Sequence, residues 1–362
     1  MTPEEARGLF PVLERRAYLN AGTFGPLALP TAAAMREELD ADLKAGRFGK
    51  EYFERMLDLR KQARTVLGGL VGAEPEQVSL TGSTTDGCNI VLAGLDLRRD
   101  DEIVTTSEEH FGLLGPVHAS GARVVVVQPD ADAILASVTP RTRLLALSQV
   151  LWTSGRALPV RELREQAGVP VLVDGAQSVG AIPVDAAGLD FLTISGQKWL
   201  CGPDSTGALV VAEPERLRVA RPSYFSQTSY EPSGSFEPAD GAARFDPGWA
   251  SSAVMAGLLA AIAMRPEWAF DRAAQQTSRC RELLAAQADV VPGDATLVAF
   301  RAEDPAALVE KLAGADVVVR EIPKTGLVRV SCGWWTNEDD LSRLTAALSE
   351  TAGLRSGPLQ GS

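Results

Sequence analysis

The stretch DFLTISGQKWLCGPDSTGALVVA, residues 190–212, contains two short apolar runs with a lysine between them. The runs 190–196 and 207–212 are rich in aliphatic residues, which is typical of strands covered on both faces. Lys198 follows the first run, in a turn that also holds glycine, proline and tryptophan. At the end of a buried strand an amine is desolvated, so its pKa falls and it becomes available as a nucleophile or base. The alternative is an ordinary lysine on a solvated loop.

Five more apolar runs precede this stretch, and segments with helical spacing lie between the runs. A further helical pattern occupies residues 31–71. Alternating strands and helices predict a doubly wound α/β domain with a mainly parallel sheet of seven strands. The five preceding runs are 78–82, 102–107, 122–128, 143–150 and 169–175.

The last third of the chain predicts a smaller α+β domain. Residues 221–249 have the Gly, Pro and aromatic content of a long functional loop, and an Ala/Leu-rich helix follows at 251–264. A closing helix is expected from Asn337 to about Glu350, with Thr336 as its cap. Between them we expect strands at 295–300, 316–321 and 327–332 and a helix at 305–313. The predicted organisation is an N-terminal segment that packs on the small domain (1–15), a large domain (16–250), a small domain (251–355) and a tail (356–362).

The composition of the chain argues against several classes of binding partner. The chain has 362 residues and a net charge of −12 without any basic block, which argues against nucleic acid and anionic membranes. Four scattered cysteines and two histidines fit neither a disulfide framework nor a metal site. The N-terminus lacks an apolar signal region, and the longest apolar stretch, 254–264, is too short to span a bilayer. We therefore expect a soluble cytoplasmic protein.

Three polar clusters follow predicted strands, at the sheet edge where open α/β sheets bind ligands. The turn TGSTTDGCN, 81–89, is typical of a phosphate site at a helix start or of a simple helix cap. Asp174 ends the run VLVD, where a desolvated carboxylate needs a cation or a strong donor unless it only caps the next helix. Lys198 is one strand–connection–strand unit further on, so neighbouring strand ends can direct both side chains at one ligand.

One cofactor accounts for all three clusters. Pyridoxal phosphate needs a lysine for its Schiff base, a carboxylate that keeps its ring nitrogen protonated, and a phosphate site. The sequence therefore predicts pyridoxal phosphate as the cofactor.

With these motifs the chain resembles the class V aminotransferase family, a branch of the fold-type I pyridoxal-phosphate enzymes that includes cysteine desulfurases, cystine C–S lyases, aminotransferases and epimerases. The resemblance runs from YLNAGTFGPL (18–27) to VRVSCGWWTNEDDLSRL (328–344). It implies a homodimer with shared active sites, in which residues 244–252 complete the partner's site. It also implies an amino acid as the substrate.

The resemblance assigns a role to each motif residue. Lys198 of SGQKW would form the aldimine with the cofactor, and His110 of EEHFG would stack on the ring and move protons, although a lone histidine is often structural. Arg329 would grip the substrate carboxylate, unless it is a strand-edge partner in a salt bridge. Asn20 would contact the substrate. The remaining cofactor contacts would be Asp174 to the ring nitrogen, Gln177 to the ring hydroxyl, and Thr84, Thr85 and Ser195 to the phosphate.

Departures from the family pattern favour one reaction. Desulfurases commonly carry a histidine before the lysine; Gln197 stands there, so the phosphate is left to hydroxyls and backbone groups. No cysteine precedes Arg329 in VVVREIPKTGLVR, and Cys332 follows it, so a mobile sulfur acceptor is not favoured. SQVLWTSGRALP (148–159), TTDGCNIVLAGLD (84–96) and RVSCGWW (329–335) look most like cystine C–S lyases. We therefore expect β-elimination from cysteine- or cystine-like amino acids, giving pyruvate and ammonia.

Other functions remain open from the sequence. An aminotransferase or an epimerase of the same family would share every cofactor residue. A persulfide-forming desulfurase and a pyridoxal-phosphate-binding regulator without activity are less favoured. SGQK (195–198) and KTG (324–326) match motifs of penicillin-binding proteins, but no SDN lies between them, and S-x-x-K should open a helix rather than follow a strand.

Overall fold

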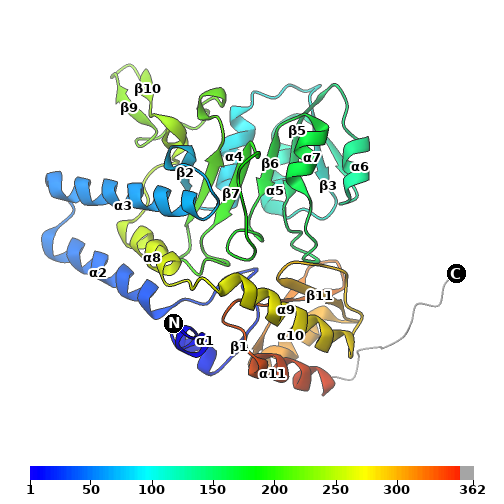
Figure 1. Ribbon diagram of the computed structural model, residues 1–362. Helices are drawn as coiled ribbons and strands as arrows, with labels where there is room; N and C mark the ends of the chain where they lie inside the picture. The colour runs from blue at the N-terminus through cyan, green and yellow to red at the C-terminus, as the bar shows by residue number, and fades with distance from the viewer. Residues whose placement is uncertain (351–362) are drawn as a thin grey trace.

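The computed structural model of the chain describes residues 1–350 (Figure 1). The predicted tail, 356–362, and the last residues of the predicted small domain lie outside the described residues.

A seven-stranded sheet forms the larger part of the molecule, in the order β2-β8-β7-β6-β5-β3-β4 (Figure 1). Only β8 runs antiparallel to its neighbours, so the predicted mainly parallel sheet is confirmed. Each strand falls on one of the seven apolar runs. The bounds are β2 Val78–Thr81, β3 Glu102–Thr106, β4 Arg123–Val127, β5 Thr142–Ser148, β6 Val171–Asp174, β7 Phe191–Ser195 and β8 Gly207–Val211.

Apolar side chains cover both faces of this sheet, as the continuous aliphatic runs require. Along β5, Leu145 and Leu147 pack into one core cluster, while Leu144 and Ala146 pack into a second. Alternate residues of a strand point to opposite faces, so one short run supplies both cores. Each fully buried leucine stabilises the fold by about 1.5–3 kcal/mol relative to an exposed one. The connecting helices are α4 Thr84–Gly94, α5 Phe111–Ala119, α6 Ala131–Ala136 and α7 Val160–Ala167.

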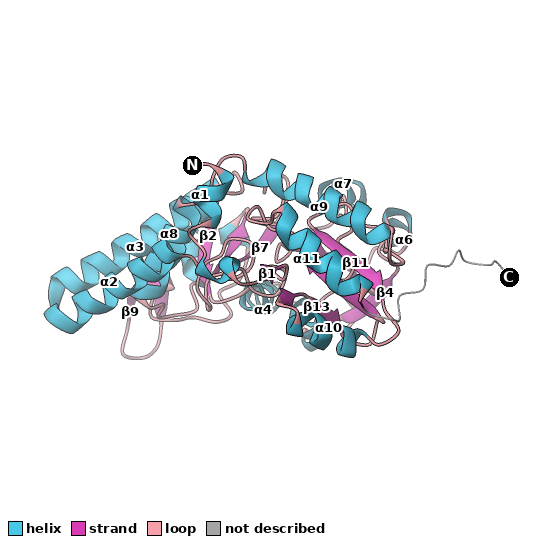
Figure 2. Ribbon diagram, turned by 90° about the horizontal axis from the view of Figure 1, so that it is seen from below, coloured by secondary structure: helices cyan, strands magenta, loops and turns pink. Residues whose placement is uncertain are grey.

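The helical pattern over 31–71 forms two helices, α2 Leu29–Ala45 and α3 Gly49–Gly69. Gly46, which ends α2, and Gly49, the first residue of α3, have φ values of +79° and +76°, a backbone region that side chains disfavour. α8, Ser252–Ala263, packs against both helices, and Figure 2 shows the three together on one side of the molecule. Met255 and Leu258 of α8 also belong to a core cluster of the large sheet.

A three-stranded antiparallel sheet, β11-β14-β13, lies in the C-terminal part with three helices around it. The predicted cap of the last helix, Thr336, is wrong by one residue. Asn337 caps it instead, since its side chain accepts the backbone N–H of Asp340 and Asp340 returns a bond to the Asn337 N–H. The bounds are α9 Ala269–Ala285, β11 Leu297–Arg301, α10 Pro305–Gly314, β13 Arg320–Ile322, β14 Leu327–Ser331 and α11 Glu338–Ser349.

The first residues of the chain contact this C-terminal part. Arg7, at the end of α1 Pro3–Arg7, forms an ion pair with Asp340 at 2.7 Å and donates to the Trp335 carbonyl. β1, Ala17–Tyr18, pairs with β12, Val317–Val318. The predicted domain boundaries themselves stay a prediction.

The segment 221–249, expected to be a loop, contains a short hairpin of β9 Gln227–Tyr230 and β10 Phe236–Pro238. A 3-10 helix, Gly241–Phe245, follows it. Within residues 1–350, no helix has both the length and the apolar character needed to cross a membrane. The same residues contain no cluster of three His, Cys, Asp or Glu side chains suited to a metal ion.

Candidate active site

The candidate site lies where three neighbouring strands of the large sheet end. Ser148 at the end of β5 pairs in register with Asp174 at the end of β6, and Asp174 pairs with Thr193 near the end of β7. Lys198 comes three residues after β7 ends. The sheet thus brings together the carboxylate and the amine that the sequence predicted for one ligand.

Lys198 is a half-buried amine without a fixed partner. It forms no salt bridge or side-chain hydrogen bond with any residue that the structure describes. Burial lowers its pKa to about 8, Asp174 opposes that shift, and the charges of Arg329 and Arg320 add to it. A substantial share of the amine is therefore neutral near pH 8, as a nucleophile or base requires.

Asp174 presents one free carboxylate oxygen. The side chain is 3% exposed, and Oδ1 accepts the backbone N–H of Ala176 at 2.9 Å. Oδ2 has no hydrogen bond within the described part of the chain. A buried carboxylate with a free oxygen suits a protonated ring nitrogen. The capping bond from Ala176 therefore uses only one of the two carboxylate oxygens of Asp174.

Gln177 ties the loop 20–25 to the lysine turn. Its Nε2 donates to the Gly22 carbonyl at 2.8 Å, and its Oε1 accepts Nε1–H of Trp199 at 3.0 Å. The second amide hydrogen remains for a ring hydroxyl, so the predicted contact fits. The loop also approaches Lys198 closely, because a Cβ on Gly25 would lie 2.1 Å from the Lys198 carbonyl oxygen.

The predicted phosphate residues surround the start of α4. Ser83 caps this helix by accepting the Asp86 N–H, while Thr84 and Thr85 lie in its first turn, where backbone N–H groups lack helical partners. Ser195 donates its hydroxyl to Gln197 Oε1 at 2.8 Å. The amide N–H groups of Gln197 therefore remain as donors for an anion, in addition to the hydroxyls and backbone groups expected from the sequence.

His110 caps α5 beside this turn. Its Nδ1 accepts the backbone N–H of Gly112 at 3.0 Å, and its ring meets the edge of Trp152 with 4.9 Å between centroids. A Cβ on Gly112 would lie 2.7 Å from Thr85 Oγ1, so the histidine turn and the phosphate turn are adjacent. Burial and then the charge of Lys198 lower the pKa of His110, so it is neutral at pH 7.

Arg329 is a buried cation without an acidic partner. It is 1% exposed on β14, the middle strand of its sheet, and pairs with no carboxylate in residues 1–350. Nη1 donates to the Trp152 carbonyl at 2.7 Å, while Nε is buried without a partner. The alternative of a strand-edge salt bridge is wrong, since β14 is not an edge strand. A buried guanidinium of this kind is costly unless an anion joins it.

Arg320 joins the candidate site in the structure, although the sequence did not single it out. It lies directly opposite Arg329 in the β13–β14 register, and Nη1 donates to Thr23 Oγ1 at 2.9 Å. Like charges placed opposite each other destabilise a sheet, so this pair needs an anion. The signal was present in the sequence as two arginines on either side of the turn at 323–326.

Asn20 acts within the same group through Thr23. Its Oδ1 accepts the Thr23 hydroxyl at 2.8 Å, and the same Thr23 oxygen accepts from Arg320 and, at 3.4 Å, from Arg329. Asn20 also forms a bridge with Ser331. The structure therefore places Asn20 beside the arginine pair.

Glu109 is a second residue that the sequence did not single out. It is 4% exposed, and its carboxylate accepts from Thr106 Oγ1 at 2.9 Å, from Ser148 N–H at 3.0 Å and from Ser148 Oγ. Burial, with a smaller contribution from Asp174, raises its pKa to about 7. No spacing in the sequence indicates this contact, because it depends on how β3 and β5 lie together.

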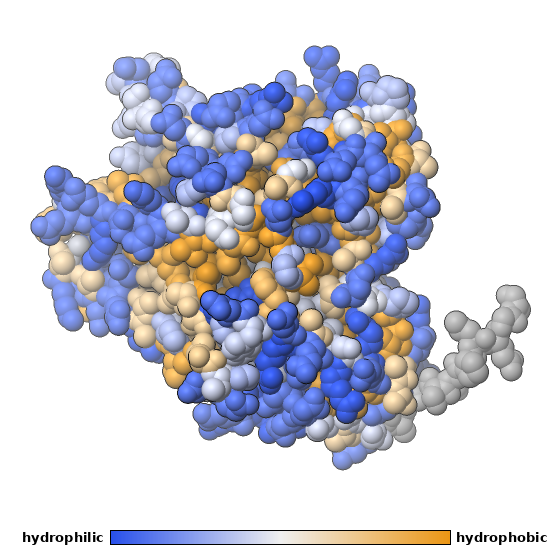
Figure 3. All heavy atoms as spheres, in the orientation of Figure 1, coloured by the Kyte–Doolittle hydropathy of each residue, from blue (hydrophilic) through white to orange (hydrophobic). Residues whose placement is uncertain are grey.

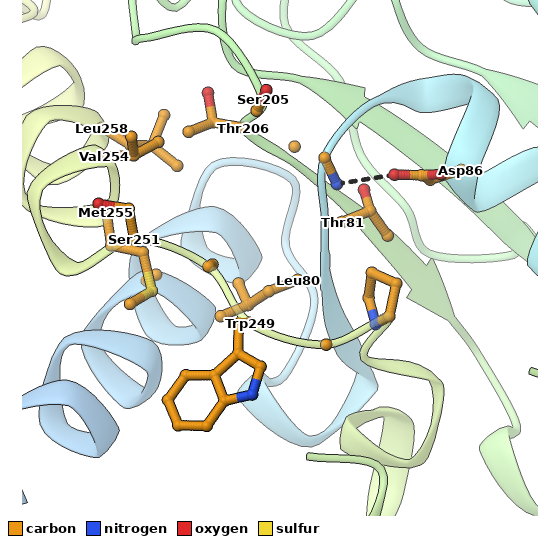
Figure 4. Close-up of a pocket in the computed structure, with 16 residues that line it drawn as sticks. Leu80, Thr81, Asp86, Ser205, Thr206, Trp249, Ser251, Val254, Met255 and Leu258 are labelled. Carbon is orange, nitrogen blue, oxygen red and sulfur yellow. Dashed lines mark hydrogen bonds between the residues drawn. The ribbon is translucent and has the colours of Figure 1, made fainter. Parts of the chain in front are cut away.

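A cavity of about 260 Å³ lies next to the phosphate turn (Figure 4). Thr81 and Asp86 line it from the turn, and Trp249 and Ser251 line it from the segment before α8. Gly82 N–H donates to Asp86 at 3.1 Å, the bond drawn in Figure 4. The lining includes none of Lys198, Asp174 or Arg329.

Comparison with known proteins identifies the family of the chain. A sequence profile of the family "Aminotransferase class-V" matches residues 30–310. The chain belongs to the class V aminotransferase family. Enzymes of this family use pyridoxal phosphate, so the predicted enzyme class and cofactor are confirmed at the level of the family.

Relatives of this member of the class V aminotransferase family include enzymes of different reaction types. It is 30% identical over 224 residues to a probable cysteine desulfurase of Methanothermobacter thermautotrophicus, covering 58% of this chain and 56% of that protein. It is 34% identical over 253 residues to the isopenicillin N epimerase of Amycolatopsis lactamdurans, and the match covers 63% of this chain and 61% of that protein. The chain thus spans less than two thirds of the length of these curated relatives.

A solved structure of the cystine C–S lyase C-DES, in complex with its product cysteine persulfide, matches with a TM-score of 0.88. The sequences are 28% identical, and the match covers 94% of this chain and 99% of that one. Another structure of C-DES holds a pyridoxal-phosphate cofactor linked to glycine. The predicted fold-type I architecture is confirmed.

The raised pKa of Glu109 predicts how stability depends on pH. The folded protein binds this proton more tightly than the unfolded chain, so the contribution of Glu109 to stability is present below pH 4.5 and is lost as the pH rises through about 7. The difference corresponds to about 3 kcal/mol. Glu109→Gln removes the charge, so we expect its free energy of unfolding to gain by that amount over wild type between about pH 4 and about pH 8.

Urea unfolding at several pH values measures the gain. Glu303→Gln, at an exposed position, controls for the loss of one negative charge. If the free energies of unfolding of Glu109→Gln and wild type change with pH in parallel, the pKa of Glu109 is not raised.

Proposed function

We propose that this member of the class V aminotransferase family catalyses β-elimination from cysteine- or cystine-like amino acids. The observation that favours this reaction over persulfide formation is that Cys88, Cys201, Cys280 and Cys332 are all buried. Burial raises the pKa of Cys201 and contributes to the raised pKa of Cys332, so neither is a ready thiolate. A persulfide-forming desulfurase needs a reachable cysteine, and this chain offers none. The likeness to C-DES supports the lyase reaction.

Two arginines without an acidic partner in the described residues support a substrate that carries carboxylates. Arg329 would hold the α-carboxylate, where Nε, which has no partner, and Nη2, which donates only to Thr23 at 3.4 Å, can form a bidentate pair. Arg320 lies directly opposite and has no acidic partner in the described residues. A substrate with two carboxylates, as in cystine, would satisfy both cations.

The chain's own side chains then have distinct tasks. Bound pyridoxal phosphate would supply an electron sink for the carbanion formed at Cα. Lys198 would hold the cofactor and then take the proton from Cα, since its amine is partly neutral near pH 8. Asp174 would keep the ring nitrogen protonated, and Gln177 would contact the ring hydroxyl. Thr84, Thr85, Ser195 and the amide of Gln197 would hold the phosphate.

Incubation of the protein, loaded with pyridoxal phosphate, with L-cystine tests the reaction. Pyruvate and ammonia in equal amounts are the expected products. No pyruvate from a fully loaded protein would overturn the proposal.

Epimerisation is the second candidate, because one relative is an isopenicillin N epimerase and the arginine pair would also bind its two-carboxylate substrate. In deuterated water an epimerase would exchange the Cα hydrogen and return the amino acid in both configurations. Transamination would instead leave a pyridoxamine form after an amino donor is added.

We also propose the homodimer that the resemblance implied, with a smaller contribution from residues 244–252. Asp246 is fully buried and forms ion pairs with Arg60 and Arg64, so only residues 247–251 remain to reach a partner. Figure 3 shows hydrophobic residues gathered around α8, next to this segment. Large exposed patches of this kind mark interfaces. Exposed apolar side chains also occur on α2, the α2–α3 turn, α3 and the segment before α8: Leu39, Leu43, Phe48, Phe53, Leu57 and Trp249.

Two glutamates at this surface should separate the subunits. Leu43 and Phe48 are 83% and 75% exposed, so Leu43→Glu with Phe48→Glu costs little in a single subunit but places charges in the interface. We expect wild type to have the mass of a dimer by light scattering, and the double variant to be a monomer with activity reduced at least about 10-fold. Val126→Glu, on the edge strand β4, is the control and should remain a dimer. A wild-type monomer that binds the cofactor and turns over would contradict the shared site.

A further inference from the structure

The turn between β3 and α5 holds a buried carboxylate directly before the histidine of the candidate site. Glu109 receives one hydrogen bond from Thr106, within its own turn, and two from Ser148 at the end of β5. These bonds join the His110 turn to the strand whose last residue pairs with Asp174. Glu109 is therefore a link between the His110 turn and the sheet edge that carries the site, beside Glu108, which accepts from the Thr153 hydroxyl.

The bond to Gly112 decides which nitrogen of His110 carries the proton. Nδ1 accepts the Gly112 N–H, so its lone pair is occupied and, in the neutral ring, the proton lies on Nε2. Such a ring has no free lone pair for a substrate proton. It also cannot serve as a strong acid, because a neutral imidazole does not readily give up its remaining proton. What it offers is one N–H donor.

We propose that Glu109 is a positioning residue, which fixes the turn so that His110 enters the site as an Nε2–H hydrogen-bond donor rather than as a base. This inference rests on the proposed β-elimination, in which negative charge develops on the sulfur that leaves Cβ. A fixed N–H donor stabilises such a charge without any proton transfer. Lys198 then remains the base at Cα.

Three variants separate the hydrogen bonds that tether Glu109 to Thr106 and Ser148 from the charge of its carboxylate. In Glu109→Gln, Oε1 can still accept from Ser148, and the amide can donate to the Thr106 hydroxyl, which rotates to accept. The tether is kept and the charge is lost. Glu109→Ala removes both, and Ser148→Ala removes one hydroxyl donor while the backbone N–H of Ser148 remains.

Nitrogen NMR of the full-length protein reads the histidine directly, with or without cofactor. The chain has two histidines, so His118→Ala assigns the signals, and the exposed His118 is an internal control. In wild type and Glu109→Gln we expect one neutral tautomer of His110, protonated on Nε2, and a His110 pKa below the ordinary histidine value. The groups that act on this pKa are Lys198, Asp174, Arg320 and Arg329, and Gln leaves all of them in place.

In Glu109→Ala we expect mixed tautomers and a His110 pKa that returns toward the ordinary value. Ser148→Ala should give a result between those of wild type and Glu109→Ala. The kcat for β-elimination should fall about 10- to 100-fold in Glu109→Ala, with KM little changed. Glu109→Gln should retain most of the wild-type kcat. An unchanged His110 spectrum in both alanine variants, or an Nδ1–H tautomer in wild type, would overturn the inference. If Glu109→Ala does not fold, Ser148→Ala and Glu109→Gln still decide it. If wild type makes no pyruvate but the spectra behave as expected, the proposed reaction fails and the positioning of His110 by Glu109 stands.

Discussion

Lys198→Ala is expected to abolish the visible absorbance band that pyridoxal phosphate gives when it is joined to the protein. The same change should lower the rate of β-elimination at least about 1,000-fold, because it removes both the attachment point and the base at Cα. Lys61→Ala, at an exposed position on α3, is the matched control and should change neither property. If the band survives in Lys198→Ala with full intensity, another lysine holds the cofactor and the assignment of the site is wrong.

The lowered pKa of Lys198 gives this prediction a pH dependence. Only the neutral amine joins an aldehyde, so the rate at which cofactor-free protein takes up pyridoxal phosphate should rise with pH and level off above about 8. For a solvated lysine the uptake rate would keep rising until the pH approaches about 10.4. Stopped-flow absorbance over this range distinguishes the two, and a rate still climbing well above pH 9 would show that Lys198 is not desolvated.

The sequence predicted the sheet well because each strand is covered on both faces. A strand such as β6, Val171–Asp174, must then be apolar throughout until it reaches the edge, where Asp174 can be polar. The chain therefore indicates both the strand and the position of the ligand. The cap of α11 was misplaced because Thr336 and Asn337 are both good caps, and only the backbone geometry selects Asn337.

The parts of the site that the sequence did not reveal depend on contacts between distant segments. Arg320 matters because β13 and β14 place it opposite Arg329, and Thr23 accepts from both arginines across some 300 residues of chain. The hairpin of β9 and β10 was missed because its strands are short, exposed and polar, so they lack the apolar alternation that marks a half-buried strand.

Arg329→Met is expected to lower kcat/KM by about 100- to 1,000-fold while the protein without substrate keeps its stability or gains some. Removing a cation that binds the substrate carboxylate in a buried site costs about 2–5 kcal/mol of binding. In the protein alone, however, this guanidinium is buried beside Arg320 without any carboxylate among the described residues, and burial lowers its pKa. Replacing such a charge with an apolar side chain of similar length removes a desolvation cost. The opposite signs of the two effects are what a substrate-binding arginine predicts and a structural one does not.

Steady-state kinetics and thermal unfolding, measured on the same preparations, test this expectation. Arg329→Lys keeps a charge but loses the fork, so it should recover only a small part of the activity. Arg320→Met separates the two carboxylates: it should cost about 10-fold or more with cystine and much less with a cysteine derivative that has a single carboxylate. A marked loss of stability in Arg329→Met, or equal effects of Arg320→Met on both substrates, would show that the arginine pair serves the fold rather than the substrate.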